Sequence, residues 1–278
     1  MLKKRVITAL CGIPLLVAAV WFGEPLFTIT IVVWGALAAL EFYRLVTTAK
    51  VLPLIYFGLA WTIFFIASRN SQVVYFLQPY LSESSLAPLL LTSAMVLSLI
   101  WLLRRPQENT FAGWAWTIAG ILYIGWLLGY LVALRDLDIN RTWQSWVFLA
   151  MFTTFASDTT AFFTGRALGK HRLAPQISPS KTWEGTIGGV FAAIAVSLLF
   201  TLPTPFSLPF NWQQAIILGL LVSIFGQLGD LVESLLKRNM GVKDSSRLIP
   251  GHGGFLDRMD SVVFAGIVVY YYVVWVIQ

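Results

Sequence analysis

The chain has 278 residues, of which 58% are hydrophobic and only 12% are charged. Soluble domains carry about 25% charged residues, so this chain has too little polar surface to cover a globule, and the composition excludes an ordinary soluble domain. The net charge of +6 does not indicate nucleic-acid binding, because neither the charges nor the 12 Trp residues form a soluble stripe. Anionic lipid or phosphate fits this charge better. Cys11 is the only cysteine, which excludes an intrachain disulfide and a metal site built on thiolates.

The N-terminus carries Lys3, Lys4 and Arg5 before an apolar run, as a secretory signal peptide would. No small-residue cleavage site precedes the segment 21–25, which reads Trp-Phe-Gly-Glu-Pro. We therefore interpret the run as a retained first helix.

Apolar stretches of spanning length, separated by Pro, Gly or charge, predict an all-α integral membrane protein with about nine transmembrane helices. The predicted spans are 5–22, 26–46, 52–68, 87–103, 112–134, 145–166, 182–202, 213–236 and 261–277. The polar segment 70–86 carries scattered aromatic residues and is predicted to lie at a membrane interface.

The distribution of Lys and Arg predicts the orientation. With nine spans, 16 of the 19 Lys and Arg residues fall on the side of the N-terminus, and only Arg69, Arg135 and Arg141 fall on the other side. Cytoplasmic loops carry the excess of basic residues. The N-terminus is therefore predicted to be cytoplasmic and the C-terminus to be outside.

Acidic residues are costly inside a membrane and indicate functional sites. Asp158, Asp230 and Glu233 fall inside predicted spans. Glu41 lies near a span end, where we interpret it as the structural partner of Arg44.

The segment 230–260 is densely charged. If the eighth helix continues past its predicted end, Asp230, Glu233, Ser234 and Lys237 share one face, because they are spaced at i, i+3, i+4 and i+7. A polar face at the cytoplasmic end of a span is therefore predicted.

Asp257 and Asp260 are likewise one helical turn apart, at the start of the last span. Two helices that meet at the cytoplasmic surface would direct these carboxylates and Asp230 at one spot. Hard oxygen ligands, without Cys and with few His, suit Mg²⁺ rather than zinc.

Between these helices the residues 250–254 read Pro-Gly-His-Gly-Gly. Glycines let backbone N–H groups converge on an anion, and the following helix N-terminus adds a positive dipole. A second loop, 178–185, reads Ser-Pro-Ser-Lys-Thr-Trp-Glu-Gly and offers hydroxyls, a Lys and free N–H groups to another phosphate. Cations and carboxylates around such loops are typical of metal-assisted phosphate chemistry.

Each pattern also has a structural interpretation. Cytoplasmic Lys and Arg often only fix topology, and glycine pairs often only form tight turns or helix contacts. Asp257 and Asp260 could cap a helix, Asp230 could belong to a structural ion pair, and His171 beside Arg172 is interpreted as solvated.

Residues 234–260 resemble the signature of the phosphatidate cytidylyltransferase (CDP-diacylglycerol synthase) family. They read Ser-Leu-Leu-Lys-Arg, then Lys-Asp after four residues, then Pro-Gly-His-Gly-Gly-Phe-Leu-Asp-Arg-Met-Asp. Residues 178–185 resemble an upstream motif of the family. A further similarity lies in Asp158, Phe162, Gly165, Arg166 and Gly169. The first 145 residues resemble the family only in hydropathy and topology.

The resemblance implies that CTP and phosphatidate give CDP-diacylglycerol and pyrophosphate, with Mg²⁺ required. A second cation between the carboxylates is a further expectation. The resemblance also implies a homodimer. From the resemblance together with the distribution of Lys and Arg, we predict a bacterial-type cytoplasmic membrane with the active site facing the cytoplasm, and no nucleic-acid partner. We accordingly divide the chain into N-terminal helices, 1–144, and a catalytic region, 145–278, with active-site loops 167–181 and 237–260.

Three sets of site residues are predicted on this basis. The metal ligands are Asp158, Asp230, Asp257 and Asp260. The catalytic residues are Lys237, Arg238, Lys243, Asp244, His252 and Arg258. The substrate-binding residues are Ser178, Ser180, Lys181, Thr182, Ser234, Gly253 and Gly254.

Two other functions remain open from the residues alone. Another CTP-using membrane enzyme, such as a polyprenol kinase, would transfer the γ-phosphate and release CDP. An ion-coupled transporter also uses intramembrane acids, but it tends to place them at the midplane within repeated halves. Here the acids gather near one surface and no repeat is visible, which favours an enzyme over a transporter or a purely structural subunit.

Overall fold

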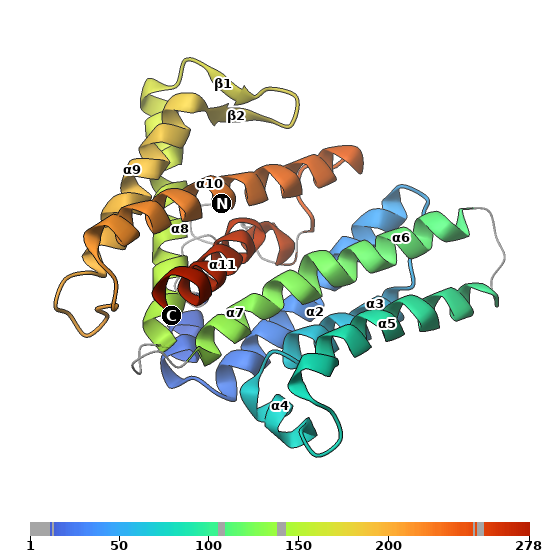
Figure 1. Cartoon of the computed structure of the whole chain (residues 1–278). Coiled ribbons are helices and arrows are strands. Elements are labelled where there is room, and N and C mark those ends of the chain that lie inside the picture. Colours follow the sequence, from blue (N-terminus) through green and yellow to red (C-terminus); the bar gives the residue numbers. More distant parts are fainter. Residues whose placement is uncertain (1–11, 13, 105–108, 138–142, 247, 249–252) are drawn as a thin grey trace. The chain divides into compact units, whose positions relative to one another are not determined.

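The computed structural model describes residues 12, 14–104, 109–137, 143–246, 248 and 253–278 (Figure 1). Within these residues the chain is mostly helical, with a single two-stranded sheet. The chain divides into two compact units, each discontinuous in sequence. The first unit comprises Met1–Asp136 and Asp244–Asp257, and the second comprises Leu137–Lys243 and Arg258–Gln278.

The first unit is a bundle of helices. Residues 14–22 are helical, followed by α2 (Leu26–Thr48), α3 (Ile55–Ala67), α4 (Ser71–Leu77), α5 (Glu83–Leu102), and α6 (Thr110–Gly120), η1 (Ile121–Trp126) and α7 (Leu127–Asp136) in one continuous run. Tyr43 of α2 is fully buried, and its hydroxyl donates a hydrogen bond of 3.0 Å to the Thr117 carbonyl of α6. The Thr117 hydroxyl in turn accepts the Leu54 N–H at 2.8 Å, just before α3. Buried polar groups thus connect the three helices.

The second unit contains four helices and the hairpin. Its elements are α8 (Trp143–Leu168), β1 (Arg172–Ala174), β2 (Ser178–Thr182), α9 (Trp183–Leu199), α10 (Trp212–Asn239), α11 (Asp260–Tyr272) and η3 (Val273–Ile277). The short 3₁₀ turn η2 (Leu256–Arg258) precedes α11. The strands β1 and β2 are antiparallel, with Arg172 opposite Thr182. A capping box between Asn211 and Gln214 fixes the start of α10, because each side chain bonds the other residue's backbone N–H.

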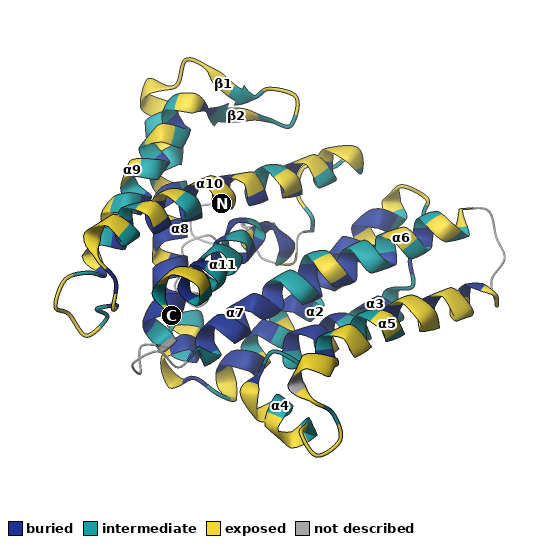
Figure 2. Cartoon of the chain, in the orientation of Figure 1, coloured by how far each residue is buried: buried dark blue, intermediate teal, exposed yellow. Residues whose placement is uncertain are grey.

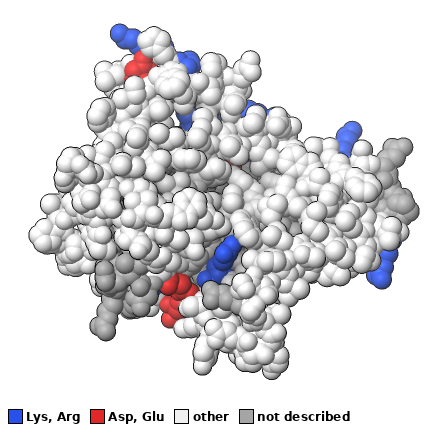
Figure 3. Space-filling view, viewed as in Figure 1, with Lys and Arg blue, Asp and Glu red and all other residues white. Residues whose placement is uncertain are grey.

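Along its C-terminal half, helix α10 buries the polar residues Gln227, Glu233, Ser234 and Lys237 and exposes apolar ones. Figure 2 shows the buried and the exposed positions of this helix. Leu228, Val232 and Leu235 are 46%, 45% and 43% exposed, whereas Glu233 is fully buried. This pattern is the reverse of a soluble helix and indicates a hydrocarbon surrounding. Most of the face drawn in Figure 3 carries neither Lys or Arg nor Asp or Glu.

Five helical segments among the described residues are long and apolar enough to cross a membrane. They are Leu26–Thr48, Ser84–Leu102, Thr110–Asp136, Trp212–Asn239 and Asp260–Ile277, and the apolar helices α3 and α9 are shorter. The prediction of a helical membrane protein is thus supported by five segments. The count of nine spans and the orientation stay predictions, and the first predicted span lies partly outside the described residues.

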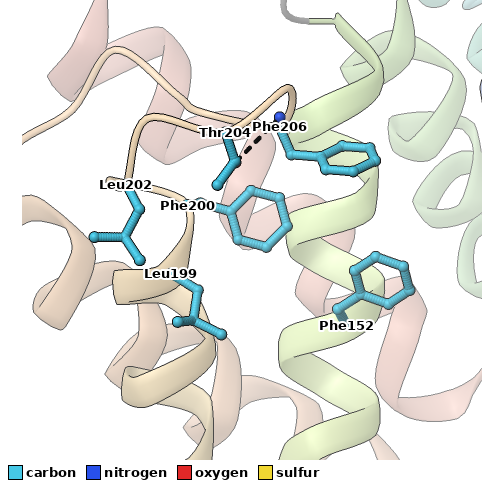
Figure 4. A pocket seen from close by; sticks show the side chains of 6 residues that line it. All are labelled: Phe152, Leu199, Phe200, Leu202, Thr204 and Phe206. Atoms are coloured by element: carbon cyan, nitrogen blue, oxygen red, sulfur yellow. Dashed lines mark hydrogen bonds between the residues drawn. The ribbon is translucent and has the colours of Figure 1, made fainter.

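A pocket of about 320 Å³ opens at the end of α9, where the chain turns toward α10 (Figure 4). Phe152 of α8 and Phe200, Leu202 and Phe206 of the turn line it, together with Leu199 and Thr204. Lys181, one of the predicted site residues, lies just before the other end of α9. At about 1.5 Å per residue, the two ends of this helix lie about 25 Å apart. The pocket therefore does not belong to the charged site.

Helices α10 and α11 approach each other closely at Gly229. A Cβ atom at this position would lie 2.4 Å from the Asp260 carbonyl oxygen and 2.8 Å from the Phe264 ring. Only glycine admits this contact without a shift, and the contact places the first turn of α11 against the turn of α10 that carries Asp230.

We expect Gly229→Ala to lower the stability of the protein by about 1–3 kcal/mol, because overpacking forces the two backbones apart. Thermal unfolding in detergent measures the effect. Gly226→Ala, one turn earlier on α10, is the matched control, since its Cβ atom would meet nothing closer than Ser261 O at 3.6 Å. Equal transition temperatures for the two variants would contradict the role of Gly229.

Candidate active site

Three carboxylates gather where α10 meets the start of α11. Asp230, Glu233 and Asp260 each offer one oxygen atom, and these oxygens all lie within 4.8 Å of one another. Asp230 and Glu233 are one turn apart on α10, and Asp260 is the first residue of α11. The prediction that Asp230 and Glu233 share one face of a helix, and that Asp260 of the next helix lies near Asp230, is confirmed.

Two lysines contact this carboxylate cluster. Lys181 Nζ lies 2.7 Å from Asp230 Oδ2, and Lys237 Nζ lies 2.5 Å from Glu233 Oε2. Ser234 donates a weaker hydrogen bond of 3.3 Å to Asp230 Oδ1. Glu233 and Lys237 are both buried, and a buried carboxylate is tolerated when a cation and hydrogen bonds accompany it. Among the described residues, no ion pair within 4 Å reaches Asp260, and its Oδ1 accepts the Ser261 N–H at 2.8 Å.

Asp158 approaches the same region from α8. Its carboxylate lies near enough to Asp230 and Asp260 for the charges to repel one another, and Lys181 attracts it. It is not a member of the group of three oxygens within 4.8 Å. Four acidic residues from three helices therefore lie near one another in the second unit.

The hairpin places one of the predicted phosphate-binding residues, Lys181, beside these acids. Lys181, in strand β2, extends to Asp230, while Ser178 is half-buried and Ser180 is exposed. Thr182 is buried and caps α9, because its hydroxyl oxygen accepts the Gly185 N–H at 3.2 Å. The Thr182 side chain therefore has a structural function, and its predicted substrate contact stays a prediction.

Arg238 fastens the hairpin to α10. Its Nε donates to the Ile177 carbonyl at 3.2 Å, between the two strands, and its Nη1 donates to the Val242 carbonyl at 3.0 Å. The guanidinium thereby fixes the hairpin turn relative to the helix that carries the carboxylates. Lys243 and Arg258 of the same unit are exposed.

Asp257 organises a loop in the first unit. Its Oδ2 atom accepts hydrogen bonds from Ser245 N at 3.0 Å, Ser245 Oγ at 2.9 Å and Gly254 N at 2.8 Å. Gly253 has φ +81°, a conformation that glycine adopts readily. These contacts hold the two ends of the loop together, and metal binding by Asp257 stays a prediction. Asp244 is exposed, and His252 lies outside the described residues.

The structure corrects the interpretation of Glu41. No ion pair joins it to Arg44 within the described part of the chain. Its carboxylate instead accepts hydrogen bonds from Ser245, Ser246, Phe255 and Leu256. The sequence showed Glu41 as an acid near the end of a predicted span, but its hydrogen-bond partners are about 200 residues away in the chain.

Glu233 was left out of the predicted set of metal ligands, although its spacing from Asp230 places it on the same face of α10.

Comparison with known proteins defines the class. The chain matches the Cytidylyltransferase family over residues 3–276, and it belongs to this family. It is 35% identical over 265 residues to the phosphatidate cytidylyltransferase of Bacillus subtilis (strain 168), which covers 95% of this chain and 94% of that protein.

Two further relatives carry the same name. The phosphatidate cytidylyltransferase of Brucella abortus biovar 1 (strain 9-941) is 35% identical over 274 residues, covering 97% of this chain and 92% of that protein. That of Synechocystis sp. (strain ATCC 27184 / PCC 6803 / Kazusa) is 33% identical over 298 residues, covering 98% and 96%. The similarity extends over nearly the whole chain and confirms the resemblance seen in the signature.

Proposed function

We propose that this chain transfers the cytidylyl group of CTP to phosphatidate and so makes CDP-diacylglycerol and pyrophosphate for phospholipid biosynthesis. The observation that carries the proposal is the cluster of Asp230, Glu233 and Asp260 with its two lysines, at the end of apolar helices. Relatives named for this activity match almost the entire chain. A lipid substrate explains why the carboxylates lie on membrane-type helices.

The reaction is an in-line displacement. One phosphate oxygen of phosphatidate attacks the α-phosphorus of CTP, a new P–O bond forms, and the bond to the β-phosphate oxygen breaks, so that pyrophosphate leaves with the electron pair. A phosphate monoester is already ionised at neutral pH, so no strong general base is needed. The task of the protein is to position the substrates and neutralise their charge.

Different residues of the second unit contribute to positioning and to charge neutralisation. Lys181 and Lys237 neutralise the carboxylates of α10, while Lys243 and Arg258 are exposed and available to substrate phosphates. Ser178 and Ser180 would bind nucleotide phosphates on the hairpin that Arg238 holds. The contributions of Asp244, His252, Gly253, Gly254 and Asp257 follow from the family signature.

The carboxylate cluster fits Mg²⁺, because its donors are all oxygens and Mg²⁺ prefers hard oxygen ligands. Asp230 and Asp260 would hold the ion, with Glu233 as the third donor, and Asp158 and Asp257 stay as further predicted ligands. When bound, the ion supplies charge neutralisation for the triphosphate. A second cation between the carboxylates is also part of the proposal.

The proposed membrane arrangement has nine helices, a cytoplasmic N-terminus and an external C-terminus. The five apolar segments and the placement of 16 of the 19 Lys and Arg residues on one side support it. We further propose a homodimer in a bacterial-type cytoplasmic membrane, with the carboxylate cluster facing the cytoplasm.

The test uses purified protein in phosphatidate-containing detergent micelles with CTP and Mg²⁺, and it measures lipid and small-molecule products together. We expect CDP-diacylglycerol and pyrophosphate in equal amounts, loss of both on adding EDTA, and recovery with excess Mg²⁺. Release of CDP with a polyprenol, and no reaction with phosphatidate, would identify a kinase instead. No reaction with either lipid would contradict both enzyme functions.

We expect Asp230→Asn to lower turnover at least about a hundredfold, because a few kcal/mol of lost charge stabilisation corresponds to that factor. The variant should elute from size exclusion like the wild type. Asp136→Asn is the matched control, since this carboxylate accepts the Ser71 N–H at the end of α7 in the first unit. Turnover within twofold of the wild type in Asp230→Asn would remove Asp230 from the metal site.

The orientation of the chain in the membrane can be tested by labelling single cysteines at the two ends of α5. In a Cys11→Ser background, Leu103→Cys should react with a membrane-impermeant maleimide only in inside-out vesicles, because it borders a predicted cytoplasmic loop. Ser82→Cys, at the other end of the same helix, should react only from the outside. Labelling of both positions from one side would contradict a membrane-spanning α5.

A further inference from the structure

Glu41 lies on α2 of the first unit and is 1% exposed. Both of its carboxylate oxygens accept hydrogen bonds from the loop ends, which we define as residues 244–246 and 253–257. Oε1 accepts Ser246 Oγ at 2.7 Å and Phe255 N at 3.0 Å, and Oε2 accepts Ser245 Oγ at 3.1 Å and Leu256 N at 2.9 Å. One side chain therefore ties both loop ends to one helix.

The approach of Glu41 depends on glycine at position 254. A Cβ atom there would lie 2.2 Å from Glu41 Oε2 and 2.2 Å from Ser245 Oγ. These contacts exclude any larger residue unless the carboxylate or the serine moves away. Gly254 thus serves here to admit the Glu41 side chain.

Trp34 makes a second attachment on the same face of α2, because it precedes Glu41 by seven residues. Its indole Nε1 donates to the Phe255 carbonyl at 3.3 Å, and its ring meets the Phe255 ring edge-on with centroids 5.8 Å apart. The loop end 253–257 is therefore held by α2 through two backbone N–H groups, a backbone carbonyl and an aromatic side chain.

The chemistry of the contact requires a carboxylate. Two backbone N–H groups and the Ser246 hydroxyl donate to Glu41, and the single proton of the Ser245 hydroxyl is shared between Glu41 Oε2 at 3.1 Å and Asp257 Oδ2 at 2.9 Å. A buried carboxylate is stable when its oxygens accept several such bonds. A glutamine would keep one oxygen and turn an NH₂ group toward donors that need an acceptor.

We propose that Glu41 is a positioning residue for catalysis, which sets the geometry of the loop that carries Asp257, Gly253 and Gly254. The proposal rests on the proposed function for its kinetic consequence, but the structural contact can be tested without substrate. It assigns to the N-terminal helices a direct part in forming the signature loop, where the sequence resemblance extended only to hydropathy and topology.

The first test is hydrogen–deuterium exchange of the full-length protein in detergent, without substrate. In Glu41→Gln, the amides of Phe255 and Leu256 should together exchange about tenfold faster, because a hydrogen bond to a charged acceptor is lost. Glu24→Gln is the matched control, since it makes the same change at a half-buried carboxylate just before α2 and should leave these amides unchanged. Unaltered exchange at Phe255 and Leu256 in Glu41→Gln would overturn the proposal.

The second test measures steady-state kinetics with CTP and phosphatidate. We expect kcat of Glu41→Gln to fall about 10- to 100-fold, as for groups that orient active-site residues, with each KM within about threefold of the wild type. Glu41→Asp keeps both acceptor oxygens at a shorter reach and should recover part of kcat and part of the amide protection. Faster exchange with unchanged kcat would overturn the positioning role.

Two further comparisons distinguish a folding defect of Glu41→Gln, and a failure of the proposed function, from a failure of the positioning proposal. If Glu41→Gln does not fold, Trp34→Phe removes the indole donor and should still speed exchange at Phe255 and Leu256 by about twofold; no change would overturn the attachment. If the wild-type protein makes no CDP-diacylglycerol, the proposed function fails, while the exchange comparison still decides whether Glu41 holds the loop.

Discussion

Carboxylates among apolar helices must find cations or hydrogen-bond donors, and this requirement organises both units. In the second unit, Lys181 and Lys237 reach Asp230 and Glu233. In the first unit, Glu41 accepts hydrogen bonds from two backbone N–H groups and the Ser246 hydroxyl, and it shares the Ser245 hydroxyl with Asp257. In the proposed function the charged arrangement binds a metal and phosphates, whereas the hydrogen-bonded arrangement holds a loop. The difference in partners therefore separates a chemical role from a positioning role.

The positions of most helices follow from local properties of the sequence. The predicted span 213–236 corresponds to α10 (Trp212–Asn239), and the predicted span 112–134 corresponds to the run Thr110–Asp136. Both predictions succeed because the length and the apolar content of a spanning helix are properties of a continuous stretch of sequence. The hairpin was not predicted. Its second strand reads Ser-Pro-Ser-Lys-Thr, without alternation, and its turn is held by a guanidinium from α10. Strand pairing of this kind depends on tertiary contacts that no local pattern contains.

The same distinction applies to the candidate site. Helical spacing was enough to place Asp230, Glu233 and Lys237 on one face, since three and four residues make one turn. The pairing of Lys181 with Asp230 joins a strand to a helix 49 positions later, and sequence spacing carries no information about it. Glu41 was assigned to a nearby arginine for the same reason, because a local cation was visible and distant backbone donors were not.

The discontinuity of the first unit has a consequence for biosynthesis. Glu41 precedes Ser246 by 205 residues, so α2 leaves the ribosome long before its loop partners exist. At bacterial or eukaryotic elongation rates this interval is about 10–40 s. During that time the carboxylate must remain protonated, hydrated or shielded by other groups at the membrane surface. Completion of the first unit therefore awaits nearly the last segment of the nascent chain, and a truncated polypeptide that ends before residue 245 would lack the donors that this acid requires.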